Sequence, residues 1–387
     1  MIMENNNDNK VLNVPHLRFP EFTEEWVNVS LKDVADFQKE RISSGLLDES
    51  TYISTENILQ NFQGVQSAIS IPANTNVVAY KKNDILLSNI RPYLKKVWFS
   101  DRIGGCSADV FVLRSKTCEP EFLYNVIASD KFINYVMSGA KGVKMPRGDK
   151  NQMESFSFSI PAVVEQRKIS RLFQLLDERI VTQNKIIEDL KKLKSAIIDQ
   201  LYSAIKGKGY SYRQIFEIVN ERNKQLEYSN ILSASQEKGM VNREDLNLDI
   251  QFERSNINTY KVVRKGDYVI HLRSFQGGYA FSDKIGVCSP AYTILRPNDL
   301  LEFRYLSYYF TSQKFIKSLI IVTYGIRDGR SINVEEWLDM KTTIPQKEQQ
   351  RHIVDTIRNI EKKIENEELY ASYLSKQKQY LLRQLFI

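Results

Sequence analysis

Four short segments of the chain place arginine or lysine among glycine, asparagine, glutamine and serine, a mixture typical of loops. They cover residues 88–96, 141–150, 271–276 and 324–330. Guanidinium groups form paired hydrogen bonds with guanine edges and phosphates, and lysine and amide side chains add further contacts. The segments therefore predict a nucleic-acid-binding surface, with solvated turn charges as the alternative. The candidate contact residues are Asn89, Arg91, Lys95, Lys96, Lys144, Arg147, Arg273, Gln276, Arg327 and Arg330.

The overall charge agrees with a polyanionic partner. Lys and Arg number 54 against 47 Asp and Glu, which gives a net charge of +7 and a pI near 9.0. Arg91 and Arg273 are the favoured candidates, because each follows an apolar strand-like run at a matching place in an internal repeat. Matched arginines could equally stabilise a shared fold.

Residues that would carry catalysis are not found in recognisable patterns. The three cysteines and three histidines form no CxxC pair and no zinc-ligand spacing. No GxxxxGK[ST] loop, no GxGxxG turn after a strand and no Asn/Asp-Pro-Pro-Tyr/Phe tetrapeptide of the amino-methyltransferase kind occurs. Cys106 and Cys288 occupy matching GGCS and GVCS segments, where buried structural thiols are expected, and Asp84 and Asp267 have no obvious metal partners. We expect a chain without catalytic groups, metal or cofactor of its own.

The elements that position the candidate residues belong to a tandem repeat. The segment from Ile160, IPAVVEQRKISRLFQLLDERI, matches the segment from Ile344, IPQKEQQRHIVDTIRNIEKKI, without a gap. At nearly the same spacing KKNDILLSNIRPY matches VRKGDYVIHLRSF, and FSDRIGGCSADVFVLR matches FSDKIGVCSPAYTILR. The chain is therefore predicted to contain two units of similar length, each a mixed segment followed by a long helix.

Each long helix carries a heptad pattern of apolar residues that predicts a coiled coil. Polar residues fall in the same slots of both helices, Gln183 with Glu367 and Lys194 with Lys378, as expected of residues that fix register. The alternative is two amphipathic helices, each packed on its own domain. The predicted helix-pair interface, called the seam below, comprises Ile169, Phe173, Leu176, Ile180, Leu190, Ile197, Leu201, Ile353, Ile357, Ile360, Ile364, Leu374, Leu381 and Leu385.

Connectivity predicts the direction of these helices and the domain boundaries. A short linker, KGKGY, leads from the first helix into the second mixed segment, so the second helix is expected to run antiparallel to the first. The predicted segments are residues 1–160 and 207–343 for the globular parts and 161–206 and 344–387 for the helices. Pro161 and Pro345 are expected in the first turns of the helices. The fold class is α/β, mixed α+β, with an internal repeat.

Composition excludes two broad classes. With 42% hydrophobic and 11% aromatic residues the chain is too apolar for a disordered protein. No run approaches the roughly 20 apolar residues of a membrane helix, and the polar start MIMENNNDNK lacks a signal-peptide core. We expect a cytoplasmic protein.

Together these features resemble the specificity subunits of bacterial type I restriction-modification enzymes. The resemblance covers about residues 14–387 and rests on the two helix entrances reading Ile-Pro-x-x-x-x-Gln-Arg, on the opening VPHLRFPEF, and on DILLSNIRP and CSAD. The sequence departs from the family pattern at Gln349, where glutamate is usual, and at HLRS in the second copy, where the first has NIRP. These departures put individual base contacts in doubt.

The resemblance implies a division of labour. Each globular segment would be a target recognition domain that reads half of a bipartite asymmetric DNA site, and the helices would set the unread spacer. Two methyltransferase subunits and the endonuclease subunits would supply catalysis, with S-adenosylmethionine, ATP and Mg on those partners. The alternative is a coiled-coil scaffold that binds only proteins, and salt-dependent binding to duplex DNA would distinguish the two.

Overall fold

The computed structural model describes residues 12–386, except 236–237, 246–253, 272–278 and 325–330. The chain forms two compact units. Unit 1 combines Met1–Asn184 with Leu369–Ile387, and unit 2 is Lys185–Glu368. Each unit therefore holds one globular segment and a stretch of both long helices. The boundaries of the two compact units therefore fall within the long helices, whereas the four predicted segments divide the chain at the helix ends.

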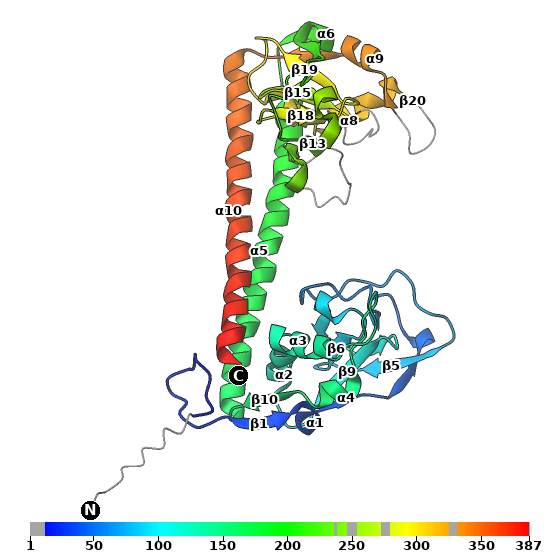
Figure 1. Ribbon diagram of the computed structural model, residues 1–387, viewed down its shortest axis with the longest axis vertical. Coiled ribbons are helices and arrows are strands. Elements are labelled where there is room, and N and C mark those ends of the chain that lie inside the picture. The colour runs from blue at the N-terminus through cyan, green and yellow to red at the C-terminus, as the bar shows by residue number, and fades with distance from the viewer. Residues whose placement is uncertain (1–11, 236–237, 246–253, 272–278, 325–330, 387) are drawn as a thin grey trace, which may run out of the picture. The chain divides into compact units, whose positions relative to one another are not determined.

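In unit 1 a four-stranded sheet, ordered β2-β9-β6-β7, forms the centre of the globular segment (Figure 1). Its strands are antiparallel, and a second sheet, β3-β5-β8-β4, includes one parallel pair, β4 with β8. The strands of unit 1 are β1 Val27–Ser30, β2 Ala35–Phe37, β3 Arg41–Ser43, β4 Tyr52–Ile53, β5 Asn76–Tyr80, β6 Ile85–Ser88, β7 Val97–Phe99, β8 Gly104–Cys106, β9 Val110–Ser115 and β10 Ser157–Ile160. The short helices are α1 Leu31–Val34, η1 Ser44–Leu46, η2 Pro92–Leu94, α2 Pro120–Ile127, α3 Asp130–Ser138 and α4 Lys150–Glu154.

The central sheet of unit 1 is buried on both faces, which explains the continuous apolar run of β6. Ile85 and Leu87 point to one face and share a core with α2, α3 and the long helix. Leu86 points to the other face, where it packs with Trp98 and Tyr80. Asn89 and Arg91 leave this strand at a point fixed by both cores.

Unit 2 repeats the plan of unit 1. Its four-stranded sheet is ordered β12-β19-β16-β17, and β11 pairs with β22 as β1 pairs with β10. The strands are β11 Lys208–Ser211, β12 Phe216–Val219, β13 Leu232–Ser235, β14 Gly239–Asn242, β15 Lys261–Val263, β16 Tyr268–Ile270, β17 Tyr279–Phe281, β18 Gly286–Cys288, β19 Thr293–Pro297, β20 Thr323–Tyr324, β21 Ser331–Ile332 and β22 Lys341–Ile344. The short helices are α6 Tyr212–Ile215, η3 Arg243–Asp245, η4 Arg254–Thr259, α7 Tyr305–Tyr309, α8 Gln313–Ser318, η5 Leu319–Val322 and α9 Val334–Asp339. The internal repeat predicted from the sequence is thus present in the strand order.

The helical runs that follow the sheets are interrupted at the same place in both copies. Helix α3 begins after Ser129, whose hydroxyl accepts a hydrogen bond from the Phe132 amide. Helix α8 begins after Ser312, whose hydroxyl accepts from the Phe315 amide. A serine N-cap in each copy therefore divides a continuous amphipathic pattern into two short helices.

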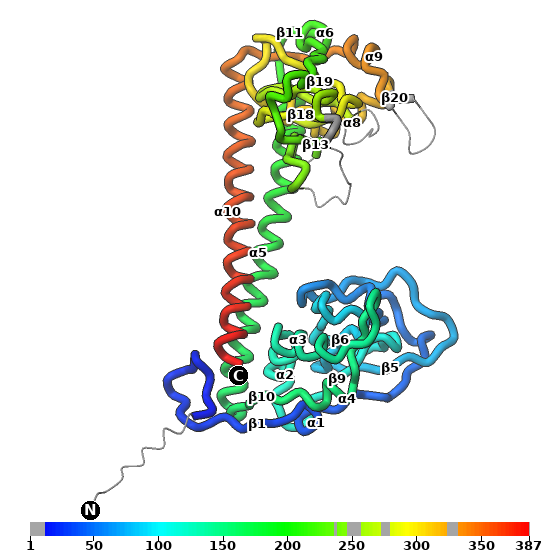
Figure 2. The backbone as a smooth tube through the Cα atoms, viewed as in Figure 1, coloured from blue at the N-terminus to red at the C-terminus, as the bar shows by residue number. Residues whose placement is uncertain are grey.

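The long helices are α5, Val163–Ser203, and α10, Lys347–Leu385, with 41 and 39 residues. Pro161 and Pro345 lie just before these helices, so their expected place in the first turn is wrong. Their carbonyls instead accept hydrogen bonds from the side chains of Gln166 and Gln350. Within each unit the two helices lie side by side and antiparallel (Figure 2).

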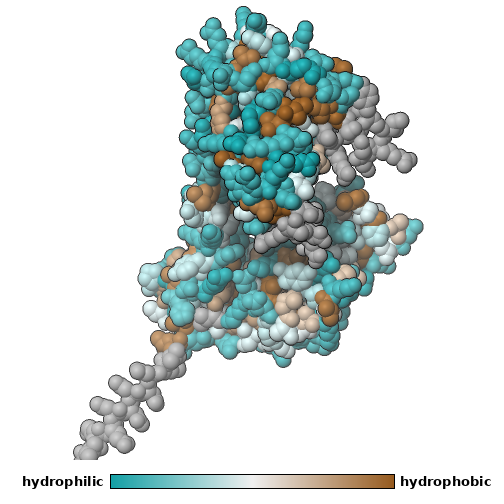
Figure 3. All heavy atoms as spheres, turned by 45° about the horizontal axis from the view of Figure 1, so that its top comes forward, coloured by the Kyte–Doolittle hydropathy of each residue, from teal (hydrophilic) through white to brown (hydrophobic). Residues whose placement is uncertain are grey.

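The visible face in Figure 3 is largely hydrophilic and is broken by small hydrophobic patches. Among the helices that the structure describes, none has the length and apolar character needed to cross a lipid bilayer.

Candidate nucleic-acid interface

The structure brings the two basic segments of the first copy together. The chain leaves β6 at Asn89, and the amide of Arg91 donates a 2.8 Å hydrogen bond to the carbonyl of Pro146 in the second segment. The amide of Gly148 donates to the carbonyl of Asn89 at 3.2 Å, and Ile90 forms an antiparallel bridge with Arg147. Residues 88–96 and 141–147 thus form one surface, although they are far apart in the sequence.

The second of these segments is a closed hairpin loop. Lys141 and Arg147 exchange backbone hydrogen bonds of 2.9 Å in both directions. Gly142, with a φ of +100°, supplies the left-handed turn residue that this closure needs. Lys144 lies exposed at the tip. The backbone that presents this lysine is therefore fixed on both sides.

Arg91 and Lys144 are the exposed cations of this surface for which the described structure gives no ion-pair partner. Arg91 has a φ of 50°, a left-handed conformation that costs a non-glycine residue free energy. Two features hold this conformation: the hydrogen bond from the Arg91 amide to the carbonyl of Pro146, and the buried Pro92 that follows. Arg147 forms a 3.0 Å ion pair with Asp109, and both side chains are more than one third exposed. The amide oxygen of the half-buried Asn89 is buried and accepts no hydrogen bond.

Lys95 and Lys96 have partners inside the chain. Lys95 forms a 2.6 Å ion pair with Asp130, and this bond lowers the pKa of the Asp130 carboxyl. The ammonium group of Lys96 donates to the carbonyl of Thr55, and its burial lowers its pKa. Both lysines therefore stabilise the turn that carries Arg91.

The candidates of the second copy, Arg273, Gln276, Arg327 and Arg330, lie outside the described residues. The strand that leads to the first two is β16, which occupies in its sheet the place of β6. His271 follows this strand, and its ring makes an edge contact with Tyr292 at 5.0 Å between centroids.

Directly before β6 and directly before β16 a buried aspartate binds an arginine of the neighbouring strand. The carboxylate of Asp84 accepts two hydrogen bonds from Arg114, 2.8 and 2.7 Å long, and Asp267 accepts two of 2.9 Å from Arg296. Both aspartate side chains are 2% exposed. These two pairs explain why the aspartates recur in the repeat. The signal was present in the sequence, because the arginines that end VFVLR and YTILR recur as well.

Two glutamines at the helix entrances connect the helices to the globular segments. The Gln166 amide group donates to Pro161 at 2.8 Å and accepts from the Glu119 amide at 2.9 Å. The Gln350 amide group donates to Pro345 at 2.9 Å and accepts from the Glu302 amide at 2.8 Å. Neighbouring ion pairs, Arg167 with Glu119 and Arg351 with Glu302, are both 2.9 Å long. The Gln-Arg pair of the repeat therefore fixes the start of each helix.

Every seam residue is buried or half-buried in the structure. At the helix ends the seam also joins the globular cores, since Ile169 and Phe173 pack with α2 and α3, and Ile353 and Ile357 pack with the core of unit 2. The coiled-coil interpretation and its alternative, amphipathic helices packed on their own domains, thus each describe part of the packing. In unit 2 Ile198 is more buried than Ile197, because the globular core lies on that side of the helix.

The polar residues in the seam form ion pairs across it. In unit 1 Lys378 contacts Asp177 at 2.6 Å, and in unit 2 Lys194 contacts Glu361 at 3.4 Å. In the repeat Lys378 corresponds to Lys194 and Glu361 to Asp177, so the two pairs are equivalent. Gln183 is buried at 5% exposure. The matched lysine slots thus serve the pairing of the two helices, whereas Glu367 forms an ion pair with Lys363 of its own helix.

The buried thiols are unsuited to nucleophilic chemistry. Cys106 and Cys288 are fully buried, and burial raises the pKa of each thiol to about 12. Cys118 is also buried, and its thiol lies 3.2 Å from the amide oxygen of Gln166. These cysteines are part of the packing.

Comparisons with known proteins agree on one family. Residues 23–192 match the family model of the type I restriction modification DNA specificity domain. The chain is 24% identical to the specificity subunit of type I restriction enzyme MjaVIII of Methanocaldococcus jannaschii, over 95% of this chain and 93% of that protein. It is 22% identical to the EcoDI specificity subunit of Escherichia coli, over 47% of this chain and 43% of that subunit.

Solved structures show the same fold. A chain from a structure of type I restriction-modification complex assembly superimposes with a TM-score of 0.62 at 18% identity, covering 92% of this chain and 96% of that one. The type I specificity subunit of M. genitalium gives a TM-score of 0.54 at 14% identity, covering 97% and 99%. Residues 23–192 thus match the type I specificity-domain family, and the chain, with two copies of one plan and two long helices, shares the fold of these type I restriction-modification proteins.

Proposed function

We propose that each globular segment of this chain reads one half of a bipartite, asymmetric duplex DNA site. The observation that carries the proposal is the joined surface of unit 1, where Arg91, Lys144 and Arg147 lie on two loops that hydrogen-bond to each other. A rigid loop pair reduces the entropy lost when side chains are ordered on DNA. The repeated sheet would present a second surface after β16.

The residues of the surface would have different tasks. Arg91, on a fixed backbone at the end of a buried strand, suits a bidentate contact to a guanine edge. Lys144 is a mobile point charge at a loop tip and suits a phosphate. Asn89 carries an amide oxygen without a hydrogen-bond donor, and a base amino group would satisfy it.

The long helices would hold partners as well as set the spacer. Helix α10 carries Leu369, Tyr373 and Tyr380, all more than 50% exposed. At 100° per residue these three lie within about 40° of one another on one face of the helix. An exposed apolar stripe of this kind marks a protein-binding surface. Two methyltransferase subunits would pack on the helices, and endonuclease subunits would join them.

In this proposal the chain itself is not an enzyme. S-adenosylmethionine, ATP and Mg would be bound by the partner subunits, whose chemistry this chain would direct to a DNA sequence.

A DNA-binding experiment with matched variants tests the proposal. Methylation-aware sequencing of DNA modified by the complex first identifies the site. Arg91→Ala should then relax one base position at about 1–3 kcal/mol, and Lys144→Ala should lower the salt slope of binding by about one unit. Lys82→Ala is the control, because this exposed lysine precedes β6 and so lies at the opposite end of the strand.

Two results would contradict the proposal. If the complex binds duplex DNA without salt dependence or sequence preference, the chain is a scaffold. If Arg91→Ala and Lys144→Ala behave as Lys82→Ala does, the joined loops are not the reading surface.

A further inference from the structure

In unit 1 a peptide segment covers the start of the long helix. Residues 12–26, called the arm below, precede β1 and lie against the first turns of α5 (Figure 1). Arg18 donates two hydrogen bonds, 2.8 and 2.7 Å long, to Glu165, whose side chain is 1% exposed. The arm also reaches the end of α10, since the amide of Leu17 donates to the carbonyl of Gln384 at 3.2 Å.

A second helix residue holds the arm as well. Lys168 forms an ion pair with Glu21, and its ammonium group lies 4.5 Å from the ring centre of Phe19. At the start of the arm, Asn13 donates to the carbonyl of Trp26 at 2.6 Å, next to β1. Glu165 and Lys168 are therefore the α5 residues whose side chains bind the arm.

Unit 2 has no arm at the equivalent place. Helix α5 ends at Ser203 and β11 begins at Lys208, so only residues 204–207 stand where unit 1 has the arm. Gly207 lets this short linker pass close to β22, because a Cβ atom there would overlap the carbonyl of Ile344. The linker therefore stays on the strand and leaves the first turns of α10 uncovered.

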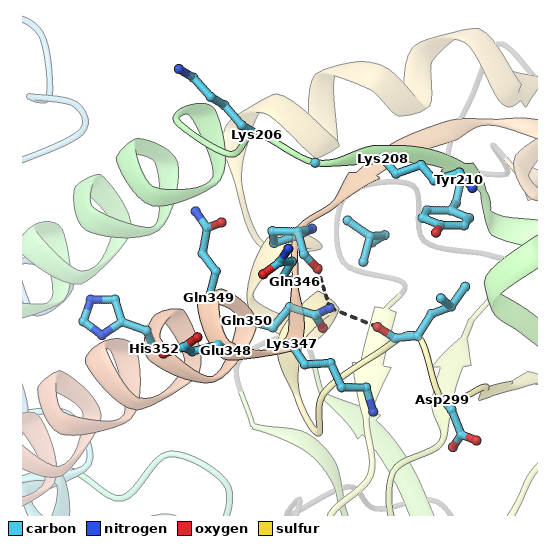
Figure 4. A pocket seen from close by; sticks show the side chains of 14 residues that line it. Lys206, Lys208, Tyr210, Asp299, Gln346, Lys347, Glu348, Gln349, Gln350 and His352 are labelled. Atoms are coloured by element: carbon cyan, nitrogen blue, oxygen red, sulfur yellow. Dashed lines mark hydrogen bonds between the residues drawn. The ribbon is translucent and has the colours of Figure 1, made fainter.

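A cavity of about 940 Å³ lies there (Figure 4). Gln349 and His352 line it, and in the repeat they correspond to Glu165 and Lys168, the two residues that bind the arm in unit 1. Tyr210, Leu300 and Pro345 supply an apolar wall. We call this cavity the α10 groove.

The charges of the α10 groove differ from those of the site on α5 that the arm covers in unit 1. Gln349 replaces the carboxylate that binds Arg18, so a guanidinium would lose its ion pair here. Lys206, Lys208 and Lys347 line the groove together with Asp299 and Glu348, which leaves a small excess of positive charge. Lys347 lies 3.9 Å from Glu302, so Lys206 and Lys208 are the lysines of the lining offered to an occupant. For Lys206 the described structure gives no ion-pair partner, and Figure 4 shows Lys206 and Lys347 extending to opposite sides of the opening. The groove therefore favours a carboxylate-bearing occupant.

We propose that the α10 groove binds an extended acidic segment of a methyltransferase subunit, in the manner in which the arm covers α5. This inference rests on the proposed function, which supplies the partner. A polypeptide fits better than a DNA backbone because the equivalent site in unit 1 holds a polypeptide.

Photo-cross-linking in the assembled complex tests the inference. The full chain carrying benzoylphenylalanine at Gln349 is assembled with the methyltransferase subunits, irradiated, and digested for mass spectrometry. We expect a cross-link to a methyltransferase peptide that contains Asp or Glu. The same label at Lys317, an exposed residue of α8 outside the groove lining, is the control and should not capture that peptide.

A charge variant gives a second measurement. Lys206→Glu should weaken the binding of the methyltransferase subunit about two- to fivefold at low salt, as expected for one exposed ion pair. Lys206→Arg should keep the affinity, and Lys317→Glu should leave it unchanged.

The outcomes separate the two proposals. A complex that assembles on DNA but gives no cross-link from the groove, or a cross-link only to DNA or to a second copy of this chain, overturns the inference and leaves the proposed function intact. Unchanged affinity of Lys206→Glu also overturns it. A chain that does not assemble with methyltransferase subunits at all refutes the proposed function, and the inference with it.

Discussion

Replacing Asp84 by Asn tests whether the buried aspartate–arginine pair stabilises the central sheet of unit 1. The side chain keeps its shape but loses its charge. In the native structure the Asp84 carboxylate accepts two hydrogen bonds from Arg114 and one of 2.7 Å from the amide of Lys81. An asparagine offers one acceptor oxygen, so its NH2 group would face a second donor.

The size of the effect follows from the burial of the two partners. Removing one member of a fully buried pair costs about 3–5 kcal/mol. Arg114 is 29% exposed and can regain water, and one acceptor remains in the asparagine, so we expect a loss of about 2–3 kcal/mol. For a unit of this size such a loss lowers the melting temperature by about 4–12 °C.

Denaturation of the full chain, followed by hydrogen exchange of individual amides, measures this loss and locates it. Asp84→Asn should reduce protection in β6 and β9 of unit 1, and Asp267→Asn should do so in β16 and β19 of unit 2. Asp101→Asn is the control, because Asp101 makes a similar pair with its neighbour Arg102 at the surface, where such pairs contribute about 0–1 kcal/mol. Equal effects of Asp84→Asn and Asp101→Asn would refute the assigned role of burial.

Three further predictions concern the helices and the core. Gln166→Ala should destabilise unit 1 by about 1–3 kcal/mol, because it leaves the partly buried amide of Glu119 without its acceptor, and Gln350→Ala should act likewise on Glu302 in unit 2, as chemical denaturation would measure. Inserting seven residues between Gln183 and Lys194 should lengthen the tolerated DNA spacer by about three base pairs and leave the half-sites unchanged, whereas two residues should weaken assembly, which methylation profiling would reveal. The Cys106 thiol should resist iodoacetamide at pH 8 in the native chain and react after unfolding, because its pKa of about 12 keeps it protonated.

Regular patterns in the sequence were sufficient for the architecture. The heptads from Ile169 to Leu201 identified the first long helix, because an apolar heptad repeat sustained over that length is specific to long paired helices. The matching of DILLSNIRP with DYVIHLRSF placed β6 and β16 at the same position of two sheets. These signals are local or repeat at a fixed offset, so one sequence contains them.

Contacts between distant segments were not predictable in the same way. The hydrogen bond from the Arg91 amide to the Pro146 carbonyl depends on how the sheet and the connection between α3 and α4 fold. No periodicity in the sequence encodes it. The ion pair of Lys95 with Asp130 likewise joins two segments that loop composition alone does not pair. The arm illustrates the same limit, because 147 positions separate Arg18 from Glu165 in the sequence.

The ion pairs across the seam bear on how such a chain could arise. Each long helix carries an acid and a lysine at the same repeat positions, Asp177 and Lys194 in one, Glu361 and Lys378 in the other. A helix that bears both members of the pair is complementary to an antiparallel copy of itself. A gene encoding a single repeat could therefore have produced a symmetric homodimer, and duplication with fusion would have preserved its pairing while allowing the two repeats to diverge in sequence.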